Sequence, residues 1–228
     1  MSKFDMNRED VPVSQGRWDW WHVFGGHDRK GLPVRAGSES DPRIIRNPVF
    51  SNGESRTWRP SLCDGGPVAL LDLEGARSAV AIRAEEAWEE WRYARLRYPA
   101  FQTIGSLHER ARSSEGKYSF HQASVDYRNQ SLVKRLHGVL EAAGLRPMLG
   151  DPLGHFGDDP NRFIRLEVAH AIPTNVLLTL DGRWIDGTLL TSPGEGHPID
   201  DEYFVFADNY LSTALDPDSY MVRVRFHS

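Results

Sequence analysis

Three residues near the two ends of the chain carry groups suited to acid–base chemistry: Asp19, His27 and His227. A histidine changes its charge near neutral pH, and a nearby carboxylate can orient it for proton transfer. Arg223 and Arg225 would add positive charge to stabilise a phosphate. If the segments that contain Asp19 and His227 form neighbouring strands, these groups meet. Asp19, His27 and His227 are therefore our candidate catalytic residues for an enzyme, metal-dependent or His/Asp-based, that acts on a phosphodiester or nucleotide.

The spacing of the other metal-ligating residues does not predict a metal site. The chain has nine histidines, but they form no HExxH or HxH pattern. Its single cysteine, Cys63, has no partner for a disulfide or a CxxC motif. We interpret Cys63 as an inert, partly buried thiol. The chain also lacks the glycine-rich motifs that bind nucleotide cofactors, so we predict neither a metal nor a cofactor.

A second group of residues has the chemistry of a binding surface. Trp18, Trp20 and Trp21 precede a glycine pair, and arginines are frequent from residue 17 to residue 59. Tryptophan rings can stack on bases while arginines bind phosphates, and both residue types are common at the centres of protein interfaces. The candidate binding residues are Trp21, Arg29, Arg56, Trp58 and Arg59.

These observations favour a non-enzymatic protein that binds nucleic acid or a partner protein, with the enzyme as the alternative. The sequence leaves two further points open. The tryptophans can instead form part of the core, with the arginines decorating a loop. In a strand, Trp18 and Trp20 share one face and Asp19 and Trp21 the other, so burial of the first pair would leave the second for a site.

Composition limits the other classes of function. The 228 residues have a net charge of −5, which gives no reason to expect general attraction to nucleic acid or to membranes. No apolar run approaches the roughly 18 residues that a membrane helix needs. With a polar N-terminus and one cysteine, we expect a cytoplasmic protein without a membrane partner. The sequence does not determine the oligomeric state.

The elements that must position these residues follow from periodicity and from turn signals. Apolar residues recur at helical spacing in five segments, and the remaining apolar segments have the pattern of strands. The predicted helices are 72–98, 106–113, 120–143, 161–171 and 201–215. The predicted strands are 18–24, a hairpin of 175–180 and 183–185 around Asp181-Gly182, and 220–226. We expect a two-residue type I′ turn in this hairpin.

These elements predict an α+β fold with a small, mainly antiparallel sheet of about four strands and helices packed on one face. We expect a flexible N-terminal arm over residues 1–16. Residues 17–228 then form a single domain, with a long loop-rich insertion at 25–67.

Three separated pieces of the chain resemble a known group of proteins. They are the segment Trp18–Gly26, the hairpin segment from Pro173 to Trp184, and the C-terminal segment 220–227. The chain is similar here to an uncharacterised family common in actinobacteria and their phages, which has an early WDWY…GG segment and a late PT…DGxW hairpin. The resemblance implies a cytoplasmic protein of a phage or mobile element, and it implies no activity. This chain departs from the family pattern at 27–29 and at Arg183.

Overall fold

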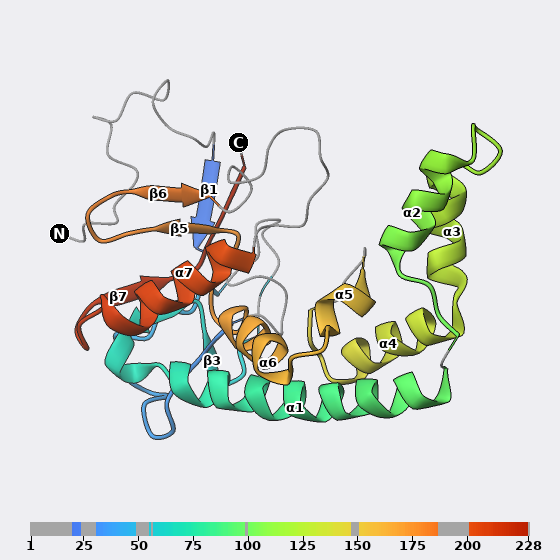
Figure 1. The fold of residues 1–228 in the computed structure, drawn as a ribbon. Coiled ribbons are helices and arrows are strands. Elements are labelled where there is room, and N and C mark those ends of the chain that lie inside the picture. Colours follow the sequence, from blue (N-terminus) through green and yellow to red (C-terminus); the bar gives the residue numbers. More distant parts are fainter. Residues whose placement is uncertain are drawn as a thin grey trace. The chain divides into compact units, whose positions relative to one another are not determined.

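The fold was analysed in a computed structural model, and it belongs to the α+β class with helices dominant (Figure 1). The structure describes residues 20–23, 31–48, 55, 57–98, 100–146, 151–186 and 201–227, with the backbone alone at 20–22, 186 and 225–227. The predicted arm at 1–16 lies outside these residues. The chain divides into two compact units, unit 1 (Met1–Leu73 with Leu215–Ser228) and unit 2 (Glu74–Ala214). Compact units can belong to one domain or to two, so the single domain over 17–228 stays a prediction.

Most of the described helices lie in unit 2. They are α1 (Leu73–Arg97), α2 (Ile104–Ser113), α3 (Phe120–Asn129), α4 (Ser131–Ala142), α5 (Pro152–Phe156), α6 (Pro160–Ala169) and α7 (Asp201–Thr213). A short 3-10 helix, Val68–Leu70, precedes α1. The predicted helices at 72–98, 106–113, 161–171 and 201–215 are confirmed within a few residues at each end. Asp159 caps α6 by accepting a hydrogen bond from the N–H of Asn161, and Pro160 occupies the first turn.

The prediction of one helix over 120–143 is wrong, because the helix is interrupted at Gln130. This residue has an extended backbone with ψ 135°, and it separates α3 from α4. Its side chain forms two hydrogen bonds with the backbone of Gln102, accepting at 2.7 Å and donating at 2.8 Å. These bonds hold the break in place. Figure 1 shows α2 and α3 side by side before the break and α4 after it.

The core of unit 2 is built from the helices around one aromatic group. Trp91 of α1, Phe156 of α5 and Phe163 of α6 are buried, and the rings of the last two stack at 4.5 Å. The indole N–H of Trp91 donates to the carbonyl of Gly157 at 2.8 Å. Because its only polar group is satisfied, this large ring can be buried at little cost. The core therefore fixes α1 against α5 and α6.

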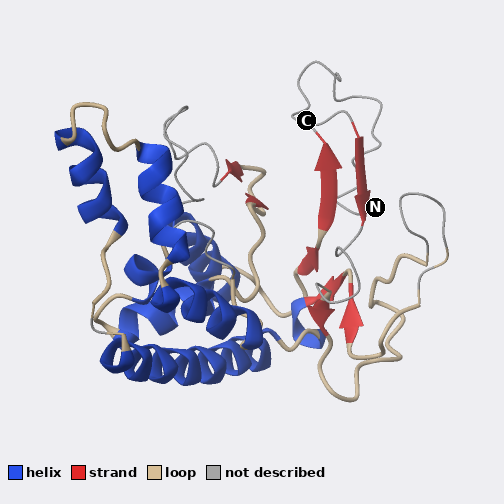
Figure 2. Cartoon of the chain, turned by 90° about the vertical axis from the view of Figure 1, so that its right-hand side faces the viewer, coloured by secondary structure: helices blue, strands red, loops and turns tan. Residues whose placement is uncertain are grey.

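The described strands are short and associate in antiparallel pairs (Figure 2). The prediction of one sheet of about four strands is therefore corrected to separate pairs within the described residues. The loop-rich insertion at 25–67 contributes three of these strands. The pairs are β1 (Trp20–Val23) with β8 (Val224–His227), β2 (Leu32–Pro33) with β3 (Leu62–Cys63), β4 (Gly65–Pro67) with β7 (Tyr220–Val222), and β5 (Val176–Leu178) with β6 (Trp184–Asp186).

The predicted hairpin is present, but its turn differs from the expected type. Leu178 pairs with Trp184, so five residues separate the two strands. Gly182 has a φ of +80° and donates to the carbonyl of Thr179 at 2.9 Å, whereas Asp181 has no positive φ. This pattern is a β-turn that ends in a left-handed glycine, and it allows the side chain of Asp181 to bond Thr179 and Arg183.

The predicted C-terminal strand is divided in two at Arg223. The N–H of Arg223 donates to the carbonyl of Asp64 at 2.8 Å. On one side of it β7 pairs with β4, and on the other side β8 pairs with β1. The C-terminal segment from β7 to β8 thus connects two strand pairs of unit 1, β4 with β7 and β1 with β8.

Candidate functional site

The structure brings together the backbones of the two chain ends that the enzyme hypothesis requires. Strands β1 and β8 are neighbours, with Trp20 opposite His227 and Trp21 opposite Phe226. Figure 2 shows the pair beside the C-terminus. Asp19, His27, Arg29 and Arg56 lie outside the described residues, and of Trp21 and His227 the backbone alone is described. The convergence of Asp19, His27 and His227 therefore stays a prediction.

The two remaining predicted binding residues lie in unit 1. Trp58 is half-buried, and its indole N–H donates to the carbonyl of Asn47 at 2.9 Å. Its ring also lies against Gly31, where an added Cβ would be 3.2 Å from a ring carbon. Arg59 is exposed. Trp58 therefore supports the loop, whereas Arg59 remains accessible for a ligand.

A neighbouring arginine shows how the basic residues of this region are used. The guanidinium of Arg46 donates to the carbonyls of Leu62, Glu39 and Pro60 at 2.9, 3.0 and 2.7 Å. A charged donor that satisfies three carbonyls fastens distant parts of a loop to one another. Arg46 is thus committed to the fold and is not available to a phosphate. The arginine-rich composition of residues 17–59 overstates the positive charge that this region offers to a ligand.

Cys63 is enclosed in unit 1 and is a poor nucleophile. Its thiol is fully buried and donates to the carbonyl of Leu32 at 3.6 Å. Burial raises the pKa of Cys63 to about 11, so the thiol stays protonated near neutral pH. Asp64 is buried beside it, and its carboxylate accepts the N–H of Asn47 at 2.8 Å. The interpretation of Cys63 as an inert thiol fits this environment.

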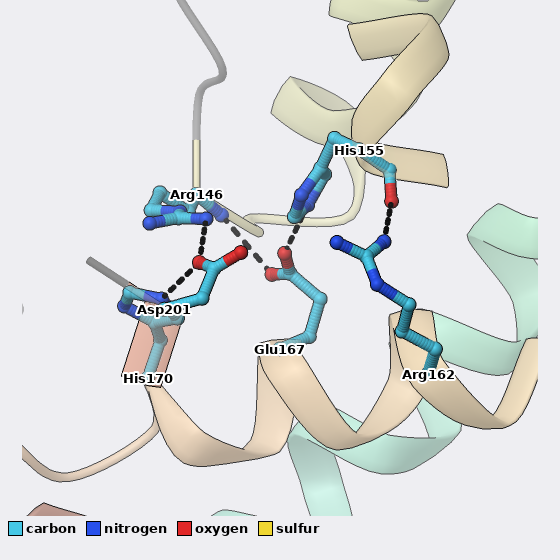
Figure 3. Close-up of polar contacts among 6 residues, drawn as sticks. All are labelled: Arg146, His155, Arg162, Glu167, His170 and Asp201. Atoms are coloured by element: carbon cyan, nitrogen blue, oxygen red, sulfur yellow. Dashed lines mark hydrogen bonds and ion pairs between the residues drawn. The ribbon is translucent and has the colours of Figure 1, made fainter. Parts of the chain in front are cut away.

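A group of polar side chains meets in unit 2 around the buried residues His155 and Glu167, and we name it the unit 2 polar cluster. Figure 3 shows its six residues, which come from four places in the chain. They are Arg146 after α4, His155 of α5, Arg162 and Glu167 of α6, His170 at the end of α6, and Asp201 at the start of α7. None of them is among the residues predicted from the sequence.

The inner half of the cluster is a histidine–carboxylate pair without access to solvent. Nε2 of His155 lies 2.5 Å from Oε1 of Glu167, and the two side chains are 1% and 2% exposed. The other carboxylate oxygen of Glu167 accepts the N–H of Arg146 at 3.4 Å. A substrate cannot reach this pair, so its role is to join α5, α6 and the segment after α4.

The outer half of the cluster is more open. Nη2 of Arg146 donates to Oδ1 of Asp201 at 3.0 Å. Nε2 of His170 lies 3.6 Å from the same oxygen, which is longer than a hydrogen bond and makes the contact electrostatic. The ring of His170 also packs on Phe204, with 3.6 Å between the ring centroids. These contacts fasten α6 to α7.

The charges of the outer half follow from these contacts. His170, together with Arg146, lowers the pKa of Asp201 to about 2, although burial opposes the shift. Burial lowers the pKa of His170 below its ordinary 6.5. At neutral pH the group is therefore a carboxylate, a guanidinium and a neutral imidazole. An imidazole beside a carboxylate can act as a general base through its other ring nitrogen. In His170 the nitrogen that faces Asp201 is Nε2, so Nδ1 is the nitrogen that would have to accept the proton.

A local signal in the sequence could have revealed part of this cluster. On α6 the apolar face falls at residues spaced by three and four, beginning with Phe163 and Leu166. Glu167 and His170 occupy the next positions of the same face. Two polar residues on a core-facing stripe predict a buried polar contact. Their partners lie on other elements and could not be found in this way.

Comparisons with known proteins give no evidence for a functional class. No protein-family model, curated protein or solved structure matches the chain. The resemblance to the actinobacterial and phage family therefore stays a prediction. Within the described ranges, His, Cys, Asp and Glu side chains form no group of three or more that could hold a metal ion. No helix in that part of the chain is long and apolar enough to cross a membrane.

We expect His170 to make folding sensitive to mild acid. The unfolded chain takes up a proton at His170 as the pH falls through about 6.5, whereas burial resists protonation in the folded chain by lowering the pKa. The free energy of unfolding therefore falls on acidification. The urea midpoint of the wild type should decrease between pH 7.5 and pH 5, and His170→Asn should remove part of that decrease. His121→Asn, at an exposed position of α3, is the control. Equal decreases in the wild type and His170→Asn would contradict this assignment.

Proposed function

We propose that this chain is a non-enzymatic interaction protein that binds a partner protein through the solvent side of α1. The observation that carries the proposal is the exposure of three large apolar side chains on this one helix. Ile82 and Tyr93 are each 58% exposed, and Leu96 is 76% exposed. Single exposed apolar residues are common, but residues gathered on one face are typical of interaction sites.

The spacing of these residues places them on one side of the helix. Ile82 and Tyr93 are eleven residues apart, which is close to three full turns, and Leu96 follows one turn later. We define the α1 outer face by its exposed residues: Ile82, Glu85, Glu86, Glu89, Tyr93, Leu96 and Arg97. The opposite side of α1 carries Ala84, Ala87, Trp91 and Ala94, which are buried. The core of unit 2 therefore does not need the apolar residues of the outer face.

The interior polar groups support a binding role over a catalytic one. His155 and Glu167 are sealed from solvent, and Arg46 is bound to three carbonyls. Trp58, one of the residues expected to bind a ligand, holds the loop through its indole N–H. These groups stabilise the fold, whereas the α1 outer face has no such role. The proposal thus keeps the predicted class of function and assigns the partner to a different surface.

The proposed binding surface can be tested in the organism that makes this protein. A photo-crosslinking amino acid at position 96 should yield an adduct with a partner protein, and the same group at Glu141, an exposed residue of α4, should not. Leu96→Glu should lower recovery of the partner by about tenfold or more, because a carboxylate would have to be buried in the interface. Equal recovery with the wild type and Leu96→Glu would overturn the proposal.

The enzyme remains a second candidate, favoured by the pairing of β1 with β8. That pairing aligns the backbone of His227 with Trp20, the residue after Asp19. An enzyme built on these residues would hydrolyse a phosphodiester, and His227→Ala would abolish that activity while the chain stayed folded. If the wild-type chain has no such activity, the second candidate fails.

A further inference from the structure

We propose that the hairpin of α2 and α3, residues 104–129, is a hinged arm that turns about Gln130 as α3 and α4 join into one helix. The hinge involves none of the residues of the α1 outer face. The two ends of the arm lie together, because Gln130 after α3 bonds Gln102 before α2. Figure 1 shows α2 and α3 side by side beyond this point. A hairpin whose two ends are adjacent can turn as one body when a few residues at those ends change their backbone torsions.

The break at Gln130 differs from a helix in a single torsion. Gln130 has a φ of −61°, which is already helical, and a ψ of 135°, where a helix needs about −42°. Glutamine is a good helix former, and the chain from Phe120 to His137 contains neither glycine nor proline. The local sequence therefore allows this ψ to rotate to the helical value.

The hydrogen bonds that favour the break are accessible to water. The side-chain amide of Gln130 accepts the N–H of Gln102 and donates to its carbonyl, and both bonds lie at the surface. The same side chain does not cap α4. In a continuous helix the first N–H groups of α4 would instead bond the carbonyls in the last turn of α3. Straightening therefore exchanges two side-chain hydrogen bonds for backbone ones.

Burial makes the bent form the more stable one. Tyr127 of α3 and Leu132 of α4 are each 1% exposed. In a continuous helix their side chains would point about 140° apart, so they could not both face the core. The hydroxyl of Tyr127 donates to the carboxylate of Asp151 and accepts the N–H of Leu153 at 3.3 Å. We call these two contacts of Tyr127 the latch, because the arm must release them to straighten.

The bent and straight forms differ in the distance between the far ends of α3 and α4. His121 and Glu141 are exposed positions near these two ends. Twenty residues of continuous helix would separate them by about 30 Å along the axis, and the bend at Gln130 shortens this distance. Spin labels on cysteines introduced at the two positions report the distance by double electron–electron resonance. The native Cys63 is fully buried and should not react with the label. We expect a main short distance and a minor one near 30 Å.

Removing the side chain of Gln130 provides the decisive comparison. Gln130→Ala should raise the ratio of long to short distances by about tenfold or more, because both bonds to Gln102 are lost and alanine favours a helix. Gln130→Glu keeps the acceptor oxygen but loses the donor, so its ratio should lie between those of the wild type and Gln130→Ala. Gln122→Ala is the matched control, because the Gln122 side chain bonds Asp126 within α3, and it should leave the ratio unchanged. An unchanged ratio in Gln130→Ala would refute the hinge.

The latch is tested by Tyr127→Phe, which keeps the buried ring and removes the hydroxyl. Asp151 and Leu153 lose their partner, so the ratio of long to short distances should again rise by about tenfold. An unchanged ratio would mean that Tyr127 does not hold the arm. Circular dichroism identifies any variant that does not fold, and if Gln130→Ala is such a variant, an unchanged ratio in Gln130→Glu refutes the hinge in its place.

Discussion

Glu167→Ala should lower the free energy of unfolding by about 3–5 kcal/mol, because it leaves the imidazole of His155 buried without its partner. Both side chains are enclosed, and Nε2 and Oε1 are 2.5 Å apart. Water cannot replace the lost carboxylate at a site without solvent access. The substitution also frees the N–H of Arg146 from its acceptor, 3.4 Å away. Urea denaturation at pH 7, followed by tryptophan fluorescence, measures the loss.

Three further variants isolate the contribution of the pair. Glu167→Gln keeps the shape and an acceptor oxygen, so it should cost less than Glu167→Ala. The double variant His155→Leu with Glu167→Leu removes both polar groups and should be more stable than Glu167→Ala, since no buried imidazole is left without its partner. Glu141→Ala, at an exposed position of α4, should change stability by less than about 0.5 kcal/mol. A similarly small loss in Glu167→Ala would show that the pair does not stabilise unit 2.

The helices of this protein were predictable from the sequence where their signals are local. Asp159 and Pro160 mark the start of α6, and Pro99 lies two residues beyond the end of α1. Gln130 shows the limit of such signals. Its side chain bonds the backbone of Gln102, 28 residues away, and this contact accompanies the break between α3 and α4. A contact over that distance leaves no trace in helical periodicity.

The candidate site could likewise be predicted in part from local sequence, while the rest depends on contacts between residues far apart in the chain. The positions of Glu167 and His170 on the apolar face of α6 can be read from the sequence. Their partner Arg146 and its acceptor Asp201 are 55 residues apart, and a third element supplies His155. Composition was also a poor guide for Arg46, because a count of arginines does not distinguish those that bind carbonyls from those open to solvent. The helical periodicity of the sequence could have located the α1 outer face. The sequence does not reveal a partner for the apolar residues of that face.

Gly65→Ala should destabilise unit 1 by about 3 kcal/mol, at the upper end of what overpacking costs. Gly65 of β4 pairs with Val222 of β7. An added Cβ would lie 2.5 Å from the carbonyl oxygen of Met221 and 2.9 Å from Cα of Val222. Both are backbone atoms of a paired strand and cannot rotate away as a side chain could. The other side of Gly65 is also occupied, since its carbonyl accepts the N–H of Ile45 at 2.7 Å.

The clash must be relieved by moving one of the backbones that meet at Gly65, and the site of that movement can be measured. Hydrogen exchange in Gly65→Ala should show lost protection at the amides of β4 and β7 and at Ile45. Gly138→Ala is the matched control, because a Cβ at Gly138 in α4 would meet no atom within 4 Å. It should stabilise the chain by about 0.5–1 kcal/mol, the usual gain from replacing a helical glycine. Unchanged stability in Gly65→Ala would mean that β4 and β7 can separate freely, and that the joining of two strand pairs at Arg223 does not constrain unit 1.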